Sequence, residues 1–162
     1  MKKVLNARFM AEAGIIAALY FALTVANASF SYGQIQARIS EALCVLPFFT
    51  PAAVPGLFIG CFFANLAGSP LGVFDVIFGS LATLLAAWAA YRIKNKWLLP
   101  LPAVVINALV VGAELYFIAK LPFFESVAYV GAGEAIATYA LGMPLFFLLY
   151  KYRKTLFRND RP

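Results

Sequence analysis

The sequence predicts an all-α membrane protein, a bundle of six transmembrane helices with both termini in the cytoplasm, and three observations support this fold class. Of the 162 residues, 64% are hydrophobic and only 12% are charged. The apolar residues form runs near the length that a helix needs to cross ~30 Å of hydrocarbon. The cationic residues are concentrated in three short segments. This composition is not typical of soluble domains, so we expect a single integral membrane domain over residues 1–162.

Six apolar segments are expected to span the membrane, at about residues 9–28, 39–51, 52–66, 73–91, 99–119 and 127–150. The first begins with basic residues, as a signal peptide does, but its long apolar run favours a retained span. The second and third segments are short and bounded by prolines, so we expect tilted helices or a re-entrant pair. Pro144 is expected to kink the sixth span.

The positions of the cationic side chains predict the orientation. Eleven of the thirteen fall near the N-terminus, between the fourth and fifth spans, or in the C-terminal tail: Lys2, Lys3, Arg8, Arg92, Lys94, Lys96, Lys151, Arg153, Lys154, Arg158 and Arg161. Loops rich in lysine and arginine stay in the cytoplasm. The loops at 29–38, 67–72 and 120–126 therefore face outward. The net charge of +6 is thus a topology signal and not an indication of nucleic-acid binding.

Four acidic residues are expected in the outer half of the membrane, on four different spans: Glu41, Asp75, Glu114 and Glu134. A charged side chain at mid-helix costs at least ~2.5–3.5 kcal/mol, so such residues are candidates for function. Asn65 lies at a similar height, and Asn107 shares a helical face with Glu114. We expect a polar cavity that is open to the exterior and closed below by apolar residues. The alternative is that the acids bind neighbouring helices or reach lipid headgroups.

The segment before the second span is unusually polar and carries Tyr32, Gln36 and Arg38. Arg38 and Glu41 are three residues apart and can pair on one helical turn. The segment is then either a lid over the cavity mouth or the site of a surface ion pair of little energetic value.

Several kinds of chemistry are disfavoured. The chain has no histidine, which removes Ser-His and Cys-His catalysis and the commonest metal ligand. Cys44 and Cys61 lie in apolar runs without CxxC spacing, which indicates buried, unreactive thiols. No phosphate-binding GxxxxGK[ST] loop occurs, so ATP would have to be used by another subunit. We therefore predict no enzyme activity, no catalytic or metal-binding residue and no cofactor.

Small residues recur every four positions in several spans. The first span carries two such stripes, Ala13 with Ala17, and Ala18 with Ala22 and Ala26. Stripes of this kind let helices approach closely. They serve either internal packing or the docking of a membrane partner.

Two stretches carry a family resemblance: YGQIQARISEALCVLPFFTPAAVPGLFIGCFFANLAGSP, and GAGEAIATYALGMPL in the last span. They resemble the QueT family of substrate-binding (S) components of energy-coupling factor (ECF) transporters. The resemblance implies a six-helix S component of a bacterial cell membrane that binds 7-deazaguanine precursors of queuosine. It also implies association with a transmembrane coupling protein and two cytoplasmic ATPases. In S components an alanine stripe of the first helix docks on the coupling protein, and the sequence leaves open which of the two stripes does so here.

A guanine-like edge offers N1–H and a 2-amino group side by side, which matches one bidentate carboxylate, expected to be Glu134 or Glu114. Asn65, Asn107, Gln36 or Arg38 is expected to donate to the ligand carbonyl. Asp75 or Glu41 would hold an aminomethyl cation, and Tyr32 or Tyr129 would stack on the rings. Two alternatives remain, an S component for a different vitamin-like ligand and a solitary carrier driven by protons.

Overall fold

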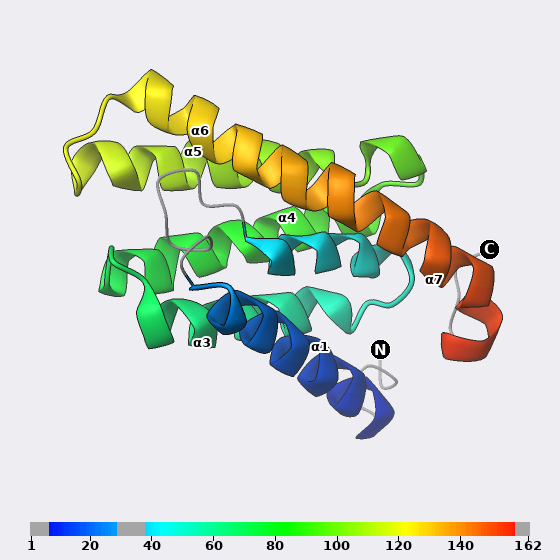
Figure 1. Cartoon of the computed structure of the whole chain (residues 1–162). Coiled ribbons are helices and arrows are strands. Elements are labelled where there is room, and N and C mark those ends of the chain that lie inside the picture. Colours follow the sequence, from blue (N-terminus) through cyan, green and yellow to red (C-terminus); the bar gives the residue numbers. More distant parts are fainter. Residues whose placement is uncertain (1–6, 29–37, 158–162) are drawn as a thin grey trace.

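The computed structural model describes residues 7–28 and 38–157, and within these ranges the chain is helical, with no strand (Figure 1). The elements, in order, are α1 (Ala7–Ala26), the 3-10 helix η1 (Ile39–Phe48), α3 (Ala53–Gly68), the π-helical segment η2 (Asp75–Gly79), α4 (Ser80–Arg92), the 3-10 turn η3 (Lys96–Leu98), α5 (Leu101–Phe117), α6 (Phe123–Ala135), the π-helical segment η4 (Ile136–Leu141) and α7 (Gly142–Leu156). The predicted all-α fold class is confirmed.

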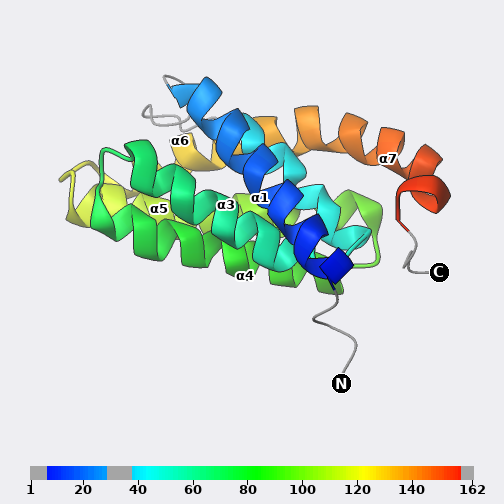
Figure 2. The ribbon, with the colours of Figure 1, turned by 90° about the horizontal axis from the view of Figure 1, so that it is seen from below.

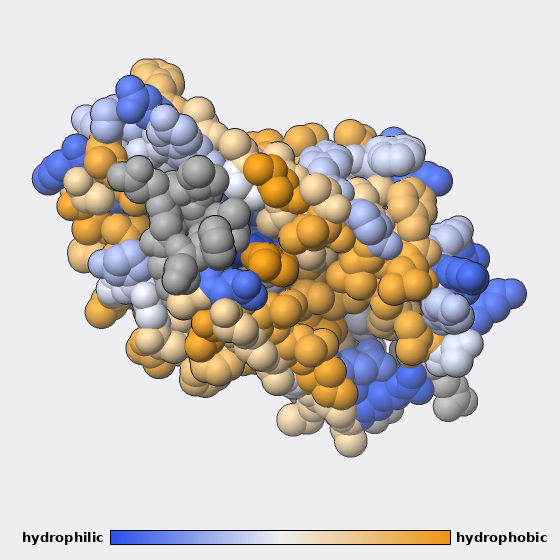
Figure 3. Space-filling model, viewed as in Figure 1, coloured by the Kyte–Doolittle hydropathy of each residue, from blue (hydrophilic) through white to orange (hydrophobic). Residues whose placement is uncertain are grey.

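Three helical stretches are long and apolar enough to cross a membrane: Ala7–Ala26, Lys96–Phe117 and Phe123–Leu156. The third joins α6, η4 and α7 into one continuous rod. The apolar helices η1 and α3 are shorter. Figure 3 shows that apolar residues cover most of the middle of one face, while hydrophilic residues gather toward its two ends. This distribution is the one that a bilayer requires.

The chain connections divide between the two ends of the bundle (Figures 1 and 2). The beginning of α1, the connection between α4 and α5, and the end of α7 lie toward one end, which we call the basic end. The connections between α3 and η2 and between α5 and α6 lie toward the opposite end. The basic end carries Arg92, Lys94, Lys96, Lys151, Arg153 and Lys154 among the described residues.

Helices α1 and α3 pack closely because α3 has glycine where α1 crosses it. A Cβ atom on Gly56 would lie 2.8 Å from the Ala13 carbonyl oxygen, and one on Gly60 would lie 2.8 Å from that of Ala17. Both distances are too short for real contacts. Ala13 and Ala17 are themselves buried. The Ala13/Ala17 stripe therefore serves internal packing of the bundle.

The 3-10 helix η1 lies in the centre of the bundle, where it packs against α1, α3, α4, η4 and α7. Every residue from 40 to 47 is buried. A ten-residue 3-10 helix is long for its type, and its rise of ~2 Å per residue gives a length of about 20 Å. Surrounding helices shield its strained backbone from lipid, which is the condition for irregular structure at membrane depth.

Two π-helical segments interrupt the longer helices. η2 begins at Asp75, and η4 begins two residues after Glu134. Pro144 lies near the start of α7 and cannot donate a backbone hydrogen bond to residue 140. The irregularity that Pro144 predicts thus takes the form of the wider turn η4 just before it. Such turns are frequent at functional sites.

At the basic end the interior is closed by apolar side chains. Phe49, Leu99, Met143 and Phe146 form a buried core with Val45 and Ala90. The Phe49 ring lies 5.2 Å from that of Phe146 and stacks on that of Phe157 at 5.1 Å. We call this core the aromatic plug. The sequence predicts an apolar floor beneath a polar cavity, and the aromatic plug is the apolar core at this end of the bundle.

Candidate functional site

Eight predicted binding residues lie in the described part of the chain, and all except Tyr129 are buried, with 6% or less of their surface exposed. The buried ones are Arg38, Glu41, Asn65, Asp75, Asn107, Glu114 and Glu134, and together with Tyr20 we call them the polar cluster. Tyr32 and Gln36, also predicted to bind, lie outside the described residues. The cluster draws its side chains from α1, η1, α3, η2, α5 and α6, and from Arg38 immediately before η1.

Arg38 joins two of these elements. Its Nη2 atom donates to Oδ2 of Asp75 at 3.0 Å, and its Nη1 atom lies 3.8 Å from the sulfur of Cys61. The predicted surface pair between Arg38 and Glu41 is wrong in both respects, because both side chains are buried and the ion-pair partner of Arg38 is Asp75. Burial explains the difference, since a buried guanidinium needs a carboxylate that is held in place.

Asp75 is held by two residues at the end of α3 and directly after it. The Ser69 hydroxyl donates to Oδ2 of Asp75 at 2.5 Å, and the Asn65 amide donates to the Asp75 carbonyl at 2.9 Å. Gly79 leaves room beside the carboxylate, because a Cβ atom there would collide with Oδ1 of Asp75. The π-helical turn therefore presents a buried, oriented carboxylate whose Oδ1 atom receives no hydrogen bond from the described residues.

Glu41 is held by groups that the sequence analysis did not assign. The Tyr20 hydroxyl and the Cys44 thiol donate to its two carboxylate oxygens, the thiol at 2.8 Å. On the next turn of α1, the Thr24 hydroxyl donates to Ser40 at 2.7 Å. Tyr20 and Thr24 are hydroxyl residues four apart in an otherwise apolar span, and this spacing was the available sequence signal for a polar face on α1.

Glu114 and Glu134 approach the centre of the cluster from α5 and α6. The Asn107 side chain lies near the Glu134 carboxylate, which is also close enough to Glu41 and Arg38 to interact with them electrostatically. Glu114 interacts electrostatically with Asp75 and Arg38. The four acids from different helices thus lie near one another in the structure.

Within residues 7–28 and 38–157, several buried oxygens of the cluster receive no hydrogen bond: Oδ1 of Asn65, Oδ1 of Asp75, Oδ1 of Asn107, both carboxylate oxygens of Glu114 and Oε2 of Glu134. All of these atoms belong to amide carbonyl or carboxyl groups, which accept hydrogen bonds when the acids are ionised. A buried acceptor without a donor costs ~1–3 kcal/mol. The arrangement therefore favours a ligand that is rich in hydrogen-bond donors and that would satisfy several of these groups at once.

Glu114 also borders an apolar groove of about 460 Å³ on the outside of the bundle. It is the single charged residue among those that line the groove, and the others include Phe74, Phe78 and Phe117. Glu114 thus lies between the polar cluster and a surface where aromatic side chains are exposed.

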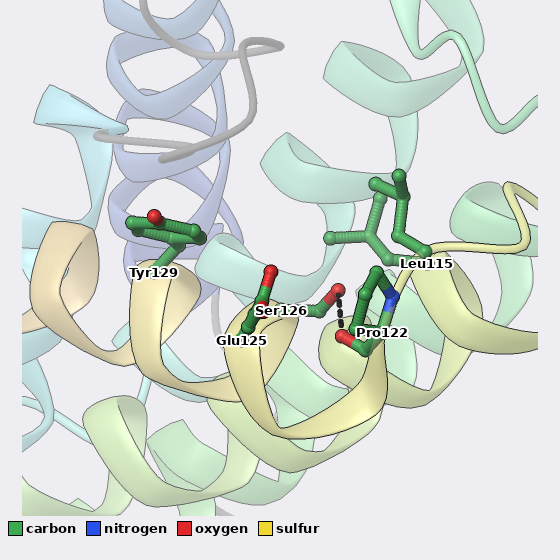
Figure 4. A pocket seen from close by; sticks show the side chains of 6 residues that line it. Leu115, Pro122, Glu125, Ser126 and Tyr129 are labelled. Carbon is green, nitrogen blue, oxygen red and sulfur yellow. Dashed lines mark hydrogen bonds between the residues drawn. The ribbon is translucent and has the colours of Figure 1, made fainter.

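A smaller pocket of about 80 Å³ lies where α5 turns into α6, away from the basic end (Figure 4). Glu125 and Tyr129 line it from successive turns of α6, and Leu115 lines it from α5. The Ser126 hydroxyl is held by the Pro122 carbonyl at 2.8 Å. Tyr129 is 54% exposed, so the predicted stacking residue lies on this rim and outside the buried cluster.

The two alanine stripes of α1 lie on different faces. Ala13 and Ala17 face α3, whereas Ala18, Ala22 and Ala26 are exposed. Gly14, one turn before Ala18, is also exposed, and a Cβ atom there would contact nothing within 4 Å. The second stripe is therefore a smooth outer face that the bundle itself does not use.

Comparisons with known proteins found one family and one relative that match the chain. The family model described as "QueT transporter" matches residues 10–151. The chain is 32% identical over 136 residues to a protein of Lactococcus lactis subsp. cremoris (strain MG1363) named "Queuosine precursor transporter QueT", and the match covers 74% of this chain and 79% of that protein. No solved structure matches the chain.

Proposed function

Because the chain belongs to the QueT transporter family, we propose that it is the substrate-binding component of an ECF-type importer in a bacterial cell membrane. Its cargo is a queuosine precursor, a 7-deazaguanine such as prequeuosine or queuine. The name of the Lactococcus relative supports this class of cargo. In this proposal the chain is a single membrane domain with six spans, and separate ATPase subunits supply the energy.

The set of buried acceptors in the polar cluster carries the ligand assignment. A 7-deazaguanine offers N1–H, a 2-amino group and a pyrrole N–H, and the aminomethyl form adds an ammonium group. The buried cluster atoms without a hydrogen bond in the described residues are six oxygens, and no nitrogen is among them. A flat base rich in donors therefore complements the site better than a carboxylate or phosphate ligand would.

The geometry allows the roles to be divided further. Glu114 has both oxygens without a hydrogen-bond donor, which is what a bidentate contact with N1–H and the 2-amino group requires. Glu134 offers one oxygen beside Oδ1 of Asn107. Asp75 retains Oδ1, whereas both oxygens of Glu41 accept bonds from Tyr20 and Cys44. We therefore assign Glu114 to the guanine edge and Asp75 to an aminomethyl cation.

The orientation follows from the basic end. In this proposal the basic end faces the cytoplasm, which is supported by the cationic residues at the start of α1, between α4 and α5, and at the end of α7. The polar cluster then lies on the exterior side of the aromatic plug, which separates it from the cytoplasm. Fusing reporter domains to each loop would test this orientation. A cytoplasmic signal from the α5–α6 connection would contradict it.

The exposed face of Ala18, Ala22 and Ala26 is the docking surface for the coupling protein in this proposal. The Ala13/Ala17 stripe is already covered by α3. Ala22→Phe should abolish copurification with the coupling protein and ATPases while ligand binding persists. Leu85→Phe, at a 53% exposed position of α4, is the matched control and should copurify normally. Normal copurification of Ala22→Phe would contradict the assignment.

Binding by purified protein is the decisive experiment. The 7-aminomethyl and 7-cyano deazaguanines, queuine and guanine should be titrated into the detergent-solubilised chain by calorimetry. We expect saturable binding of at least one deazaguanine and weaker binding of guanine. Absence of binding by all the deazaguanines, or tighter binding of an unrelated vitamin, would refute the ligand assignment. Uptake by vesicles that contain this chain without ATPase subunits would instead indicate a solitary carrier.

A further inference from the structure

Another pocket, of about 340 Å³, lies at the basic end and is separate from the polar cluster. Its walls are Phe48 of η1, Lys94 and Lys96 of the α4–α5 connection, and Phe146, Phe147 and Tyr150 of α7. The proposed uptake of substrate uses none of these residues. The pocket thus combines two ammonium groups with an aromatic lining.

Among the described residues, no acidic side chain balances the charge of this pocket. In the described ranges the ion pairs are Arg8 with Glu12 and Arg38 with Asp75, and neither involves the pocket. No acidic side chain lines it. Lys94 and Lys96 are exposed and flank Asn95 in the sequence. The pocket therefore has the charge that attracts an anion.

The lysines are carried on a well-anchored turn. The Asn95 side chain accepts a hydrogen bond from the Trp97 backbone at 3.1 Å, and the Tyr139 hydroxyl donates to the Trp97 carbonyl at 3.2 Å. The Lys96 ammonium lies 5.4 Å from the Phe147 ring centre, and the Trp97 ring lies 5.8 Å from that of Phe147. These contacts hold the connection against α7, so the pocket has a defined shape.

We propose that this pocket binds the headgroup of an anionic phospholipid of the cytoplasmic leaflet, with its phosphate between Lys94 and Lys96. The inference rests on the membrane orientation given above and not on the identity of the substrate. Basic pockets between helices on the cytoplasmic side are typical sites for acidic headgroups. The neighbouring Trp97, Leu98 and Phe147 are 56%, 48% and 41% exposed and provide the apolar surface for acyl chains. A freely soluble phosphate has no use for that surface.

The two tryptophans of the chain give a direct assay. Trp88→Phe leaves Trp97 as the single tryptophan beside the pocket. This variant is reconstituted into phosphatidylcholine vesicles that contain about 10–20% brominated phosphatidylglycerol, so that the anionic lipid is a minority. We expect quenching of Trp97 that corresponds to roughly fivefold enrichment over brominated phosphatidylcholine, since one lysine near an anionic surface contributes ~1 kcal/mol. Equal quenching by the two lipids would overturn the proposal.

Two further variants separate the pocket from general surface charge. Lys94→Gln with Lys96→Gln, in the Trp88→Phe background, should remove the preference for phosphatidylglycerol. Lys151→Gln with Lys154→Gln removes the same charge from exposed positions of α7 that do not line the pocket, and it should retain the preference. Loss of the preference in both double variants would show a diffuse electrostatic effect and would overturn the proposal.

Soluble glycerol phosphate provides the last arm of the experiment. If it relieves the quenching at millimolar concentration, the pocket takes a free phosphate and the lipid assignment is wrong. Titrating a deazaguanine into the same vesicles separates the two proposals. Normal ligand binding without lipid preference refutes only the lipid site, and lipid preference without ligand binding refutes only the substrate assignment.

Discussion

The two ends of η1 lie in opposite environments. At its beginning, Arg38 and Glu41 belong to the polar cluster, where several acceptors receive no hydrogen bond. At its end, Phe48 and Phe49 pack with Phe146 in the aromatic plug, with ring centres 5.1–5.3 Å apart. One ten-residue helix thus connects a region whose polar groups are incompletely satisfied with a buried apolar core.

This difference indicates a division of labour. Buried acceptors without a hydrogen-bond donor reduce the stability of the free protein. A ligand that donates hydrogen bonds to them removes this cost. Interlocking aromatic rings contribute dispersion and shape complementarity whether or not a ligand is present. We therefore expect substitutions in the polar cluster to change affinity, and substitutions in the plug to change stability alone. The predictions below test that separation.

Arg38→Gln should have the largest effect, because it leaves the Asp75 carboxylate buried without its cation. We expect a loss of about 3–5 kcal/mol of stability, together with loss of ligand binding, measured by thermal unfolding and calorimetry in detergent. Adding Asp75→Asn should recover most of the stability by removing the uncompensated charge, but not the affinity. If the double variant were as unstable as the single one, the ion pair would not be the cause.

Phe146→Ala should destabilise the protein by about 3–5 kcal/mol because it opens a cavity in the plug. Ligand affinity, measured at a temperature where the variant is folded, should stay within about twofold, a change worth only a fraction of a kcal/mol. Phe147→Ala, at a 41% exposed neighbouring position, is the control and should have a smaller effect on stability. A large loss of affinity in the folded Phe146→Ala protein would contradict the separation.

Glu114→Gln should weaken binding of the deazaguanine by roughly 10–100-fold, because one acceptor of a charge-assisted bidentate contact becomes a donor. Glu134→Gln should weaken it less, since this carboxylate contributes one oxygen. Isothermal titration of both variants measures the order. Glu125→Gln, on the exposed rim of the pocket in Figure 4, should bind like the unaltered protein. Unchanged affinity in both cluster variants would remove the recognition proposal.

Tyr20→Phe should have the smallest effect, a loss of about 1 kcal/mol of stability, since it removes the hydroxyl that donates to Glu41 but preserves the ring. Thermal unfolding would measure the change. Phe21→Tyr, on the exposed face of α1, adds a hydroxyl outside the cluster and should leave stability unchanged. Full stability of Tyr20→Phe would show that Cys44 alone suffices to hold Glu41.

The sequence alone determined the fold class and the set of candidate acids. Apolar runs of membrane length predict helices whatever their partners are, because the backbone must satisfy its own hydrogen bonds in lipid. Isolated acids in such runs stand out for the same reason. The predicted spans at 9–28 and 99–119 therefore lie close to Ala7–Ala26 and Leu101–Phe117 of the structure. The family resemblance, carried by contiguous motifs, was also accessible from the sequence and is confirmed.

Only the tertiary structure decided which groups pair. Arg38 is three residues from Glu41 in sequence, yet it pairs with Asp75, 37 residues away, because η2 lies beside the start of η1. The role of Tyr20 also depends on a neighbour that is distant along the chain, since its hydroxyl donates to Glu41. Likewise, both alanine stripes of α1 look equivalent in sequence, and the glycines of α3 determine which one is buried. Helical periodicity specifies the faces of each helix, whereas packing between helices specifies what each face meets.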